Sequence, residues 1–150
     1  MVFECDMKNS GFDYEINLDA NCIFVRHYGI FDLNQVIERG NRVAKHPDFR
    51  KSLNRIIDIT TCEVDFSADE IRAVWSRINK EIDQRGSYKE VLLVSSPLAH
   101  GLGRMFDSLS PVAEVQIRVY NTKEHDCFKN LRKWLGLVPD IRFPDFMATE

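Results

Sequence analysis

The fold is decided by a strand that runs directly into a helix start, in residues 90–106, EVLLVSSPLAHGLGRMF. The apolar run 90–94 is followed at once by turn residues, which is typical of a buried strand. Ser96 can cap a helix whose first residue is proline, because both residue types are favoured at those positions. Gly101 and Gly103 then lie inside this helix, where each costs about 0.5–1 kcal/mol relative to alanine. The question is whether the stretch binds a ligand or only packs closely.

The same alternation of strand and helix extends along the rest of the chain. The predicted strands are residues 12–18, 22–29, 55–59, 89–94 and 114–120. The predicted helices are residues 32–45, 67–85, from 97 onward, and a last helix that Thr122 caps and Gly136 ends. The first two strands form an antiparallel hairpin, and strands that alternate with helices imply right-handed crossovers and a largely parallel sheet. We therefore predict an α/β fold with about five strands in a mixed sheet and about four helices.

The chain length and its last residues define the domain organisation. A chain of 150 residues predicts one domain, spanning residues 1–150, with enough surface to bury a core without staples. Residues 137–150 contain two prolines and no periodic pattern, so we predict a C-terminal tail without helix or strand. Phe143 and Phe146 are the residues expected to hold this tail against the domain.

Composition argues against several classes of partner. A net charge of −3 without a cluster of basic residues disfavours nucleic acid and anionic membranes. No signal-peptide pattern and no apolar run of ~20 residues are present, so we predict a cytoplasmic protein. Cys5, Cys22, Cys62 and Cys127 have no CxxC spacing, and no two histidines have the spacing of metal ligands. We therefore expect free thiols, no metal and no cofactor.

Several short segments, taken in their order along the chain, resemble the SpoIIAA-like family. They are IFVRHYG at 23–29, IDI at 57–59, DFSADEI at 65–71 and LAHGLGRMF at 98–106. The family consists of small bacterial α/β proteins that are related to STAS domains and are compared in fold with CRAL-TRIO lipid-binding domains. The resemblance covers most of residues 14–135, and it implies this fold and a protein that binds rather than catalyses.

The resemblance to STAS domains raises one specific alternative. STAS anti-sigma antagonists present a phosphorylatable serine, in an Asp-Ser-Ser-Gly-type context, at a helix start. In this chain Ser67 lies near the equivalent place, but the following residues are Ala68 and Asp69, so the Ser-Gly context is missing. Ser67 also forms a capping box with Glu70, which explains it without a modification. A phosphorylated switch at Ser67 and a plain helix cap both remain open.

Polar residues near the carboxyl ends of the predicted parallel strands form the candidate ligand site. Open α/β sheets bind ligands at that edge, where helix N-termini present backbone N–H groups and the positive ends of their dipoles. The candidate residues are Asp58, Ser67, Ser95, Ser96, Gly101 and Arg104. Each also has a purely structural interpretation: the serines as caps, the glycines as points of close packing or of a homodimer contact, Asp58 as a buried acceptor, and Arg104 as part of an exposed stripe.

No catalytic set is visible in the sequence. The chain has no nucleophile elbow and no P-loop, and no serine, cysteine or histidine set can be assembled from spacing alone. We therefore predict a non-enzymatic binding or regulatory module for a small amphipathic or anionic ligand or for a protein partner. The alternatives are a STAS-type partner-switching regulator phosphorylated on Ser67 and, with less support, a small hydrolase or transferase.

Overall fold

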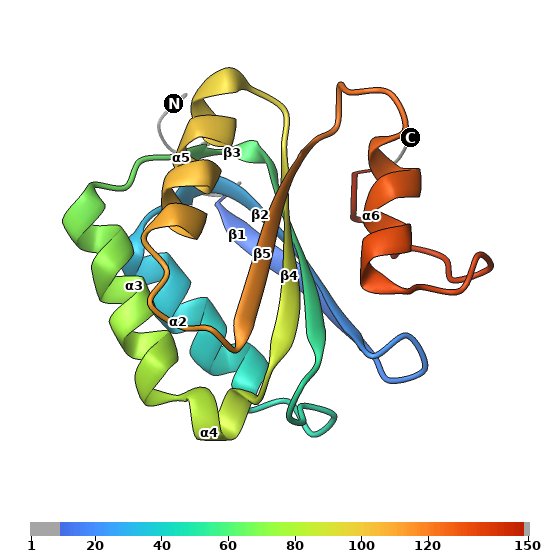
Figure 1. The fold of residues 1–150 in the computed structure, drawn as a ribbon, viewed down its shortest axis with the longest axis horizontal. Helices are drawn as coiled ribbons and strands as arrows, with labels where there is room; N and C mark the ends of the chain where they lie inside the picture. The colour runs from blue at the N-terminus through green and yellow to red at the C-terminus, as the bar shows by residue number, and fades with distance from the viewer. Residues whose placement is uncertain (1–9, 149–150) are drawn as a thin grey trace.

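The computed structural model of the protein describes residues 10–148 and shows one α/β domain built on a five-stranded mixed sheet (Figure 1). The strands are β1 (Gly11–Asn17), β2 (Cys22–Phe31), β3 (Asn54–Val64), β4 (Tyr88–Val94) and β5 (Val115–Asn121). The helices in the described residues are α2 (Leu33–Ala44), α3 (Ala68–Lys80), α4 (Ile82–Arg85), α5 (Pro97–Ser108) and α6 (Cys127–Leu135). The predicted fold class is confirmed. Residues 1–9, which include Cys5, lie outside the described residues, as do residues 149–150 of the predicted tail.

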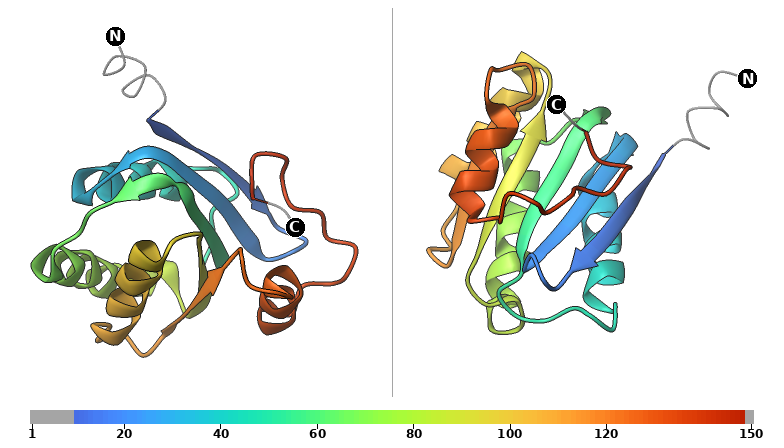
Figure 2. Two further views of the ribbon diagram at one scale, coloured as in Figure 1. Left: turned by 90° about the horizontal axis from the view of Figure 1, so that it is seen from above. Right: turned by 90° about the vertical axis from the view of Figure 1, so that its right-hand side faces the viewer.

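The strand order explains the distribution of the helices. The strands lie in the order β1-β2-β3-β4-β5, with β1 antiparallel to β2 and all later neighbours parallel. Because parallel crossovers are right-handed and each new strand is added on the same side, the three crossover helices fall on one face of the sheet. We call α2, α3 and α5 the helical layer. Figure 2 shows this layer on one face and α6 with the C-terminal segment on the other.

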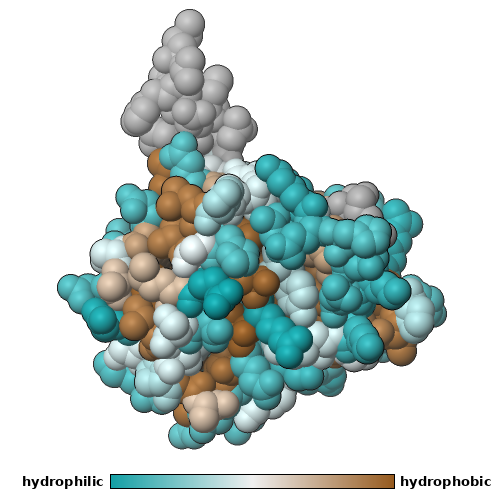
Figure 3. Space-filling view, turned by 45° about the horizontal axis from the view of Figure 1, so that its top comes forward, coloured by the Kyte–Doolittle hydropathy of each residue, from teal (hydrophilic) through white to brown (hydrophobic). Residues whose placement is uncertain are grey.

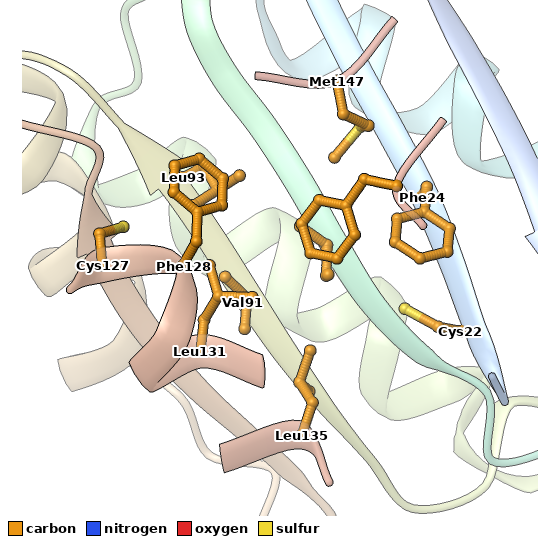
Figure 4. Packing of buried hydrophobic residues seen from close by; sticks show 11 residues of the cluster. Cys22, Phe24, Val91, Leu93, Cys127, Phe128, Leu131, Leu135 and Met147 are labelled. Atoms are coloured by element: carbon orange, nitrogen blue, oxygen red, sulfur yellow. The ribbon is translucent and has the colours of Figure 1, made fainter. Parts of the chain in front are cut away.

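The two faces of the sheet have separate cores because successive strand residues point to opposite sides. In β3, Ile57 and Ile59 pack toward the helical layer, whereas Ile56 packs toward α6. Figure 4 shows the second core, in which sheet residues meet α6 and the C-terminal segment. Its labelled members include Phe24, Val91, Leu93, Phe128, Leu131, Leu135 and Met147.

Two helix boundaries differ from the prediction. The helix that begins after Ser67 ends at Lys80, and a separate short helix, α4, runs to Arg85. The last helix begins at Cys127 rather than after Thr122, because the Thr122 hydroxyl donates to the Val94 carbonyl oxygen at 3.3 Å instead of capping a helix. A contact beyond the local sequence therefore sets the start of α6.

The C-terminal segment has no helix or strand in residues 137–148, as the sequence predicts, and it lies across the sheet. Phe143 is buried against Phe24, with ring centroids 5.1 Å apart, and Phe146 is partly buried against the same core. The Phe146 carbonyl oxygen also accepts a 2.6 Å hydrogen bond from Arg26 of β2. The segment is therefore part of the folded domain.

Candidate functional site

A cavity that is partly open to solvent lies between the sheet and the helical layer, and we call it the interlayer cavity. Its volume is about 170 Å³. Its sheet wall includes Val25, Ile57 and Leu92, and its helix wall includes Val36, Val74 and Phe106. An apolar cavity of about 150 Å³ is large enough to bind benzene, so the interlayer cavity is of a size that holds a small ligand.

Gly40 of α2 contributes directly to this space. The residue lines the cavity, and a Cβ atom placed there would meet no atom within 4 Å. Glycine in the middle of a helix costs about 0.5–1 kcal/mol relative to alanine. The helix therefore accepts a local cost at a position where a larger side chain would enter the cavity, and this makes Gly40 a convenient position for filling it.

One end of the cavity is lined by charged residues. Arg55 of β3 and Glu90 of β4 are direct partners in the parallel register, near the amino ends of their strands, and both line the cavity. Glu90 is only 8% exposed, and Arg55 Nε is buried without a hydrogen-bond partner. The Arg55 guanidinium lies over the Tyr88 ring, with Cζ 4.6 Å from the ring centroid.

Burial changes the protonation behaviour of both groups. It raises the pKa of Glu90, and the positive charges of Arg55 and Arg85 oppose that rise. Burial also lowers the pKa of Arg55, although an arginine side chain stays charged in proteins. The charged end of the cavity thus holds a guanidinium whose Nε lacks a hydrogen-bond partner and a carboxyl group whose pKa is raised by burial.

Two further arginines at this end are already paired. Glu81 lies in the break between α3 and α4, with its Oε1 3.2 Å from Arg77 Nε and its Oε2 2.8 Å from Arg85 Nη2. Both arginines line the cavity. Counting Arg55, Arg77 and Arg85 against Glu81 and Glu90, the cluster has three cations and two acids. It therefore has a surplus of one positive charge even when both carboxyl groups are ionised.

A second polar pair lies on the wall formed by β2 and α2. Arg39 Nη1 donates to His27 Nδ1 at 3.0 Å, and both residues are buried and line the cavity. The His27 ring stacks on Phe31 at 4.0 Å between centroids. Burial, followed by the nearby charge of Arg39, lowers the pKa of His27 to about 3. His27 is therefore a neutral acceptor at physiological pH.

The residues predicted from sequence lie mainly at the other end of the sheet, and none of the six lines the interlayer cavity. Ser95 Oγ donates to the Thr60 carbonyl oxygen at 3.0 Å, so the ends of β3 and β4 do meet. Ser96 Oγ accepts from Ala99 N and caps α5, and Ser67 caps α3. The structure thus brings Ser95 and Ser96 to the carboxyl edge and gives each a structural partner.

Asp58 faces away from the helical layer. It is fully buried, and its Oδ1 accepts from the backbone N–H and the hydroxyl of Thr60 at 2.9 and 2.6 Å. Its Oδ2 accepts from Ala148 N at 2.7 Å and lies 3.9 Å from Arg26 Nε. These contacts hold the C-terminal segment, which agrees with the structural interpretation of Asp58.

The two helix glycines have different surroundings. A Cβ atom at Gly103 would lie 2.9 Å from Val119 Cγ2, so Gly103 allows α5 to pack closely on β5. A Cβ atom at Gly101 would meet nothing within 4 Å, and Arg104 is exposed on the same helix. Close packing therefore accounts for Gly103 and does not account for Gly101.

Sequence reasoning missed the charged end of the cavity. Arg55 and Glu90 are two residues before Ile57 and Leu92 on their strands, so they point to the same covered face as those apolar side chains. A charged residue at an inward position of a strand is unusual unless it is paired, and that signal was available in the sequence. What the sequence does not contain is the register that places the two side by side.

The cysteines of the described chain are buried or partly buried. Burial raises the pKa of the Cys22 and Cys62 thiols to about 12. No group of three or more metal-ligating side chains was found among residues 10–148. Over the same range, no helix has the length and apolar character needed to cross a bilayer.

The fold and the cavity together define a class: a five-stranded α/β domain with a largely apolar cavity and a charged end. Comparison with family models, curated proteins and solved structures found no significant match to this chain. The functional interpretation therefore depends on the geometry of the cavity and on the resemblance described above.

Proposed function

We propose that the protein is a non-enzymatic module that binds a small amphipathic, anionic molecule in the interlayer cavity. The observation that supports this best is the buried Nε of Arg55, which lacks a hydrogen-bond partner within residues 10–148 and lies at the charged end of a largely apolar cavity. Ligand sites are mostly apolar cavities with a few polar groups that orient the ligand, and the interlayer cavity has this composition.

The energetics favour an occupied cavity over an empty one. A buried donor without a partner costs about 1–3 kcal/mol, and an anion bound to Arg55 would remove that cost. The apolar walls would also gain from covering an apolar ligand, at roughly 25 cal/mol per Å² of surface removed from water. Both free-energy contributions favour binding of a molecule with one anionic head and an apolar body.

The chemistry of the cavity walls supports binding over catalysis. Among the described residues that line the cavity there is no serine, threonine, cysteine or lysine that could act as a nucleophile. The two groups that could transfer protons, His27 and Glu90, are on separate parts of the wall, on β2 and β4. The resemblance to the SpoIIAA-like family, and through it to lipid-binding domains, also favours binding over catalysis.

A cavity-filling variant tests the proposal. Gly40→Leu places a side chain in the cavity, whereas Gly40→Ala improves the same helix position but leaves most of the space open. A ligand at about a hundred times its dissociation constant adds ~2.7 kcal/mol of stability. For a chain of this size, that raises Tm by about 5–10 °C.

The measurement is a thermal-shift screen of small amphipathic acids, alcohols and nucleotides against the wild type and both variants. We expect a shift for the wild type and for Gly40→Ala, and its loss for a folded Gly40→Leu. Because Gly40→Leu is expected to keep its stability, loss of binding would not be confused with unfolding. A ligand that shifts all three proteins equally would show that the cavity is not its site.

The structure offers one observation in favour of the phosphorylated-switch alternative. Ser67 is exposed, and its hydroxyl accepts from Glu70 N in a capping box at the start of α3. A phosphate there would lie at a helix N-terminus, which is favourable, but close to Asp65 and Asp69, which is not. Mass spectrometry of the protein from its native host tests this, and a Ser67 that is always unmodified would remove the alternative.

A protein partner or a homodimer also remains a prediction. Leu98 is 74% exposed and Met105 is 37% exposed. They lie about two turns apart on α5, with the open position of Gly101 between them. On the face in Figure 3, hydrophobic colours gather on the side where α3 and α5 lie, whereas the side of α6 is mostly hydrophilic. Analytical ultracentrifugation of the wild type and of Leu98→Glu would show whether this patch joins two copies.

A further inference from the structure

The charge of the cluster restricts the head group of the ligand. Glu81 already neutralises one of its two arginine partners, and Glu90 approaches Arg55 without forming an ion pair within 4 Å in residues 10–148. With Glu81 and Glu90 both ionised, the surplus is a single positive charge. A head group with one negative charge balances it, whereas a phosphate monoester adds about 1.5–2 negative charges beside the buried Glu90.

The geometry of the donors favours a planar head group. A guanidinium presents its N–H groups in a flat fork, which matches the two oxygens of a carboxylate. The Arg55 guanidinium is fixed in place by stacking on Tyr88, and its buried Nε still lacks a partner.

The size of the cavity restricts the apolar part. About 170 Å³ is close to the ~150 Å³ that accommodates benzene, so a compact body of roughly six to eight carbon atoms fits. A long acyl chain does not fit this volume. The aromatic rings of Phe12, Phe31 and Phe106 line the walls and suit a ring or a branched chain.

We infer that the interlayer cavity binds a small monocarboxylate, with its carboxylate on Arg55 beside Glu90 and its compact apolar body between the sheet and the helical layer. This inference rests on the proposed function and specifies the chemical class of its ligand. A neutral amphiphile of the same shape can offer Arg55 an acceptor but no opposite charge, and a cationic one adds charge of the wrong sign. The head group therefore decides the affinity, and the body decides the size limit.

The test compares head groups on one apolar body. Phenylacetate, phenylacetamide, phenethylamine and phenyl phosphate are titrated into the wild-type protein by calorimetry, with hexanoate and palmitate as size controls. Because a charge-assisted hydrogen bond contributes about 1.5–3 kcal/mol, we expect phenylacetate to bind about 10- to 100-fold more tightly than the amide. We expect hexanoate to bind and palmitate to remain unbound.

Variants locate the effect on Arg55. Arg55→Met keeps the apolar stem and removes the cation, so it should reduce the preference for carboxylate over amide to less than about 3-fold. Arg104→Met is the matched control, since Arg104 is exposed on α5 and does not line the cavity. If Arg55→Met does not fold, Glu90→Gln serves as the second variant. It removes the acid, so phenylacetate should bind it at least as tightly as the wild type.

The outcomes separate this inference from the proposed function. Equal affinity for phenylacetate and phenylacetamide, tighter binding of phenyl phosphate, or weaker binding of phenylacetate to Glu90→Gln would overturn the carboxylate inference. If such a ligand is still blocked by Gly40→Leu, the proposed function remains. If no compound of any head group binds the wild type, both are overturned.

Discussion

The buried histidine of β2 makes stability depend strongly on pH in a range where few other groups titrate. His27 is 6% exposed, accepts a hydrogen bond from Arg39 and lies between the rings of Phe12 and Phe31. Protonation in the folded state would remove the acceptor and place a second cation beside Arg39. The perturbation we consider is His27→Gln, because a glutamine oxygen can still accept from Arg39 and does not titrate.

The size of the effect follows from the lowered pKa of His27. The folded-state pKa is about 3, against about 6.5 in the unfolded chain, so the unfolded state binds the proton first as the pH falls. The stabilisation is therefore fully present above pH 6.5 and is lost progressively below it, toward pH 3. At pH 5, which is about 1.5 units below the unfolded value, the loss is about 2 kcal/mol. This figure holds for any folded-state pKa well below 5.

The assay is urea denaturation of the wild type and His27→Gln at pH 7.5 and pH 5.0. We expect the free energy of unfolding of the wild type to fall by about 2 kcal/mol more than that of the variant between these two conditions. The raised pKa of Glu90 acts in the opposite direction, but it is present in both proteins and cancels in the difference. His125→Gln, at a side chain that is 95% exposed, measures the effect of removing a surface histidine.

A parallel fall of the wild type and His27→Gln would refute the reasoning. It would mean that His27 becomes protonated in the folded protein at pH 5 and that the hydrogen bond from Arg39 does not hold it neutral. Loss of the Phe31 stacking in the variant lowers stability at both pH values and does not affect this comparison.

Two further predictions concern α5 and the C-terminal segment. Gly101→Ala should raise the free energy of unfolding by about 0.5–1 kcal/mol, because no atom lies near the added Cβ. Gly103→Ala should lower the free energy of unfolding by about 1 kcal/mol, because the added Cβ meets the stiff side chain of Val119. Urea denaturation measures both changes. Asp58→Asn places an amide nitrogen against Ala148 N, so stability should fall by about 1.5–3 kcal/mol and trypsin should cleave the C-terminal segment faster.

Each of these predictions has a result that would contradict it. Equal effects of alanine at Gly101 and Gly103 would mean that α5 does not approach β5 as closely as the Val119 contact requires. Unchanged trypsin sensitivity in Asp58→Asn would mean that the apolar contacts of Phe143 and Met147, rather than the buried carboxylate, hold the segment.

Periodicity in the sequence was sufficient for the elements and their order. Alternation in 12–18 and 114–120, apolar runs in 55–59 and 89–94, and the capping box at Ser67 are local signals that correspond to β1, β5, β3, β4 and α3. The helix boundaries at Glu81 and Cys127 were not predictable in this way. The start at Cys127 depends on a contact with a distant residue, the hydrogen bond from Thr122 to β4.

The features of the candidate site likewise fall into those that local sequence predicts and those that it does not. The sequence by itself determined the α/β class, the face to which Asp58 points relative to Ile57, and the caps at Ser67 and Ser96, because these depend on neighbours within a few residues along the chain. Only the tertiary structure decided that Arg55 lies beside Glu90 and that Gly40 opens onto the same space. The physical reason is that strand register and the spacing between helices and sheet arise from packing across the whole domain, and no local pattern encodes them.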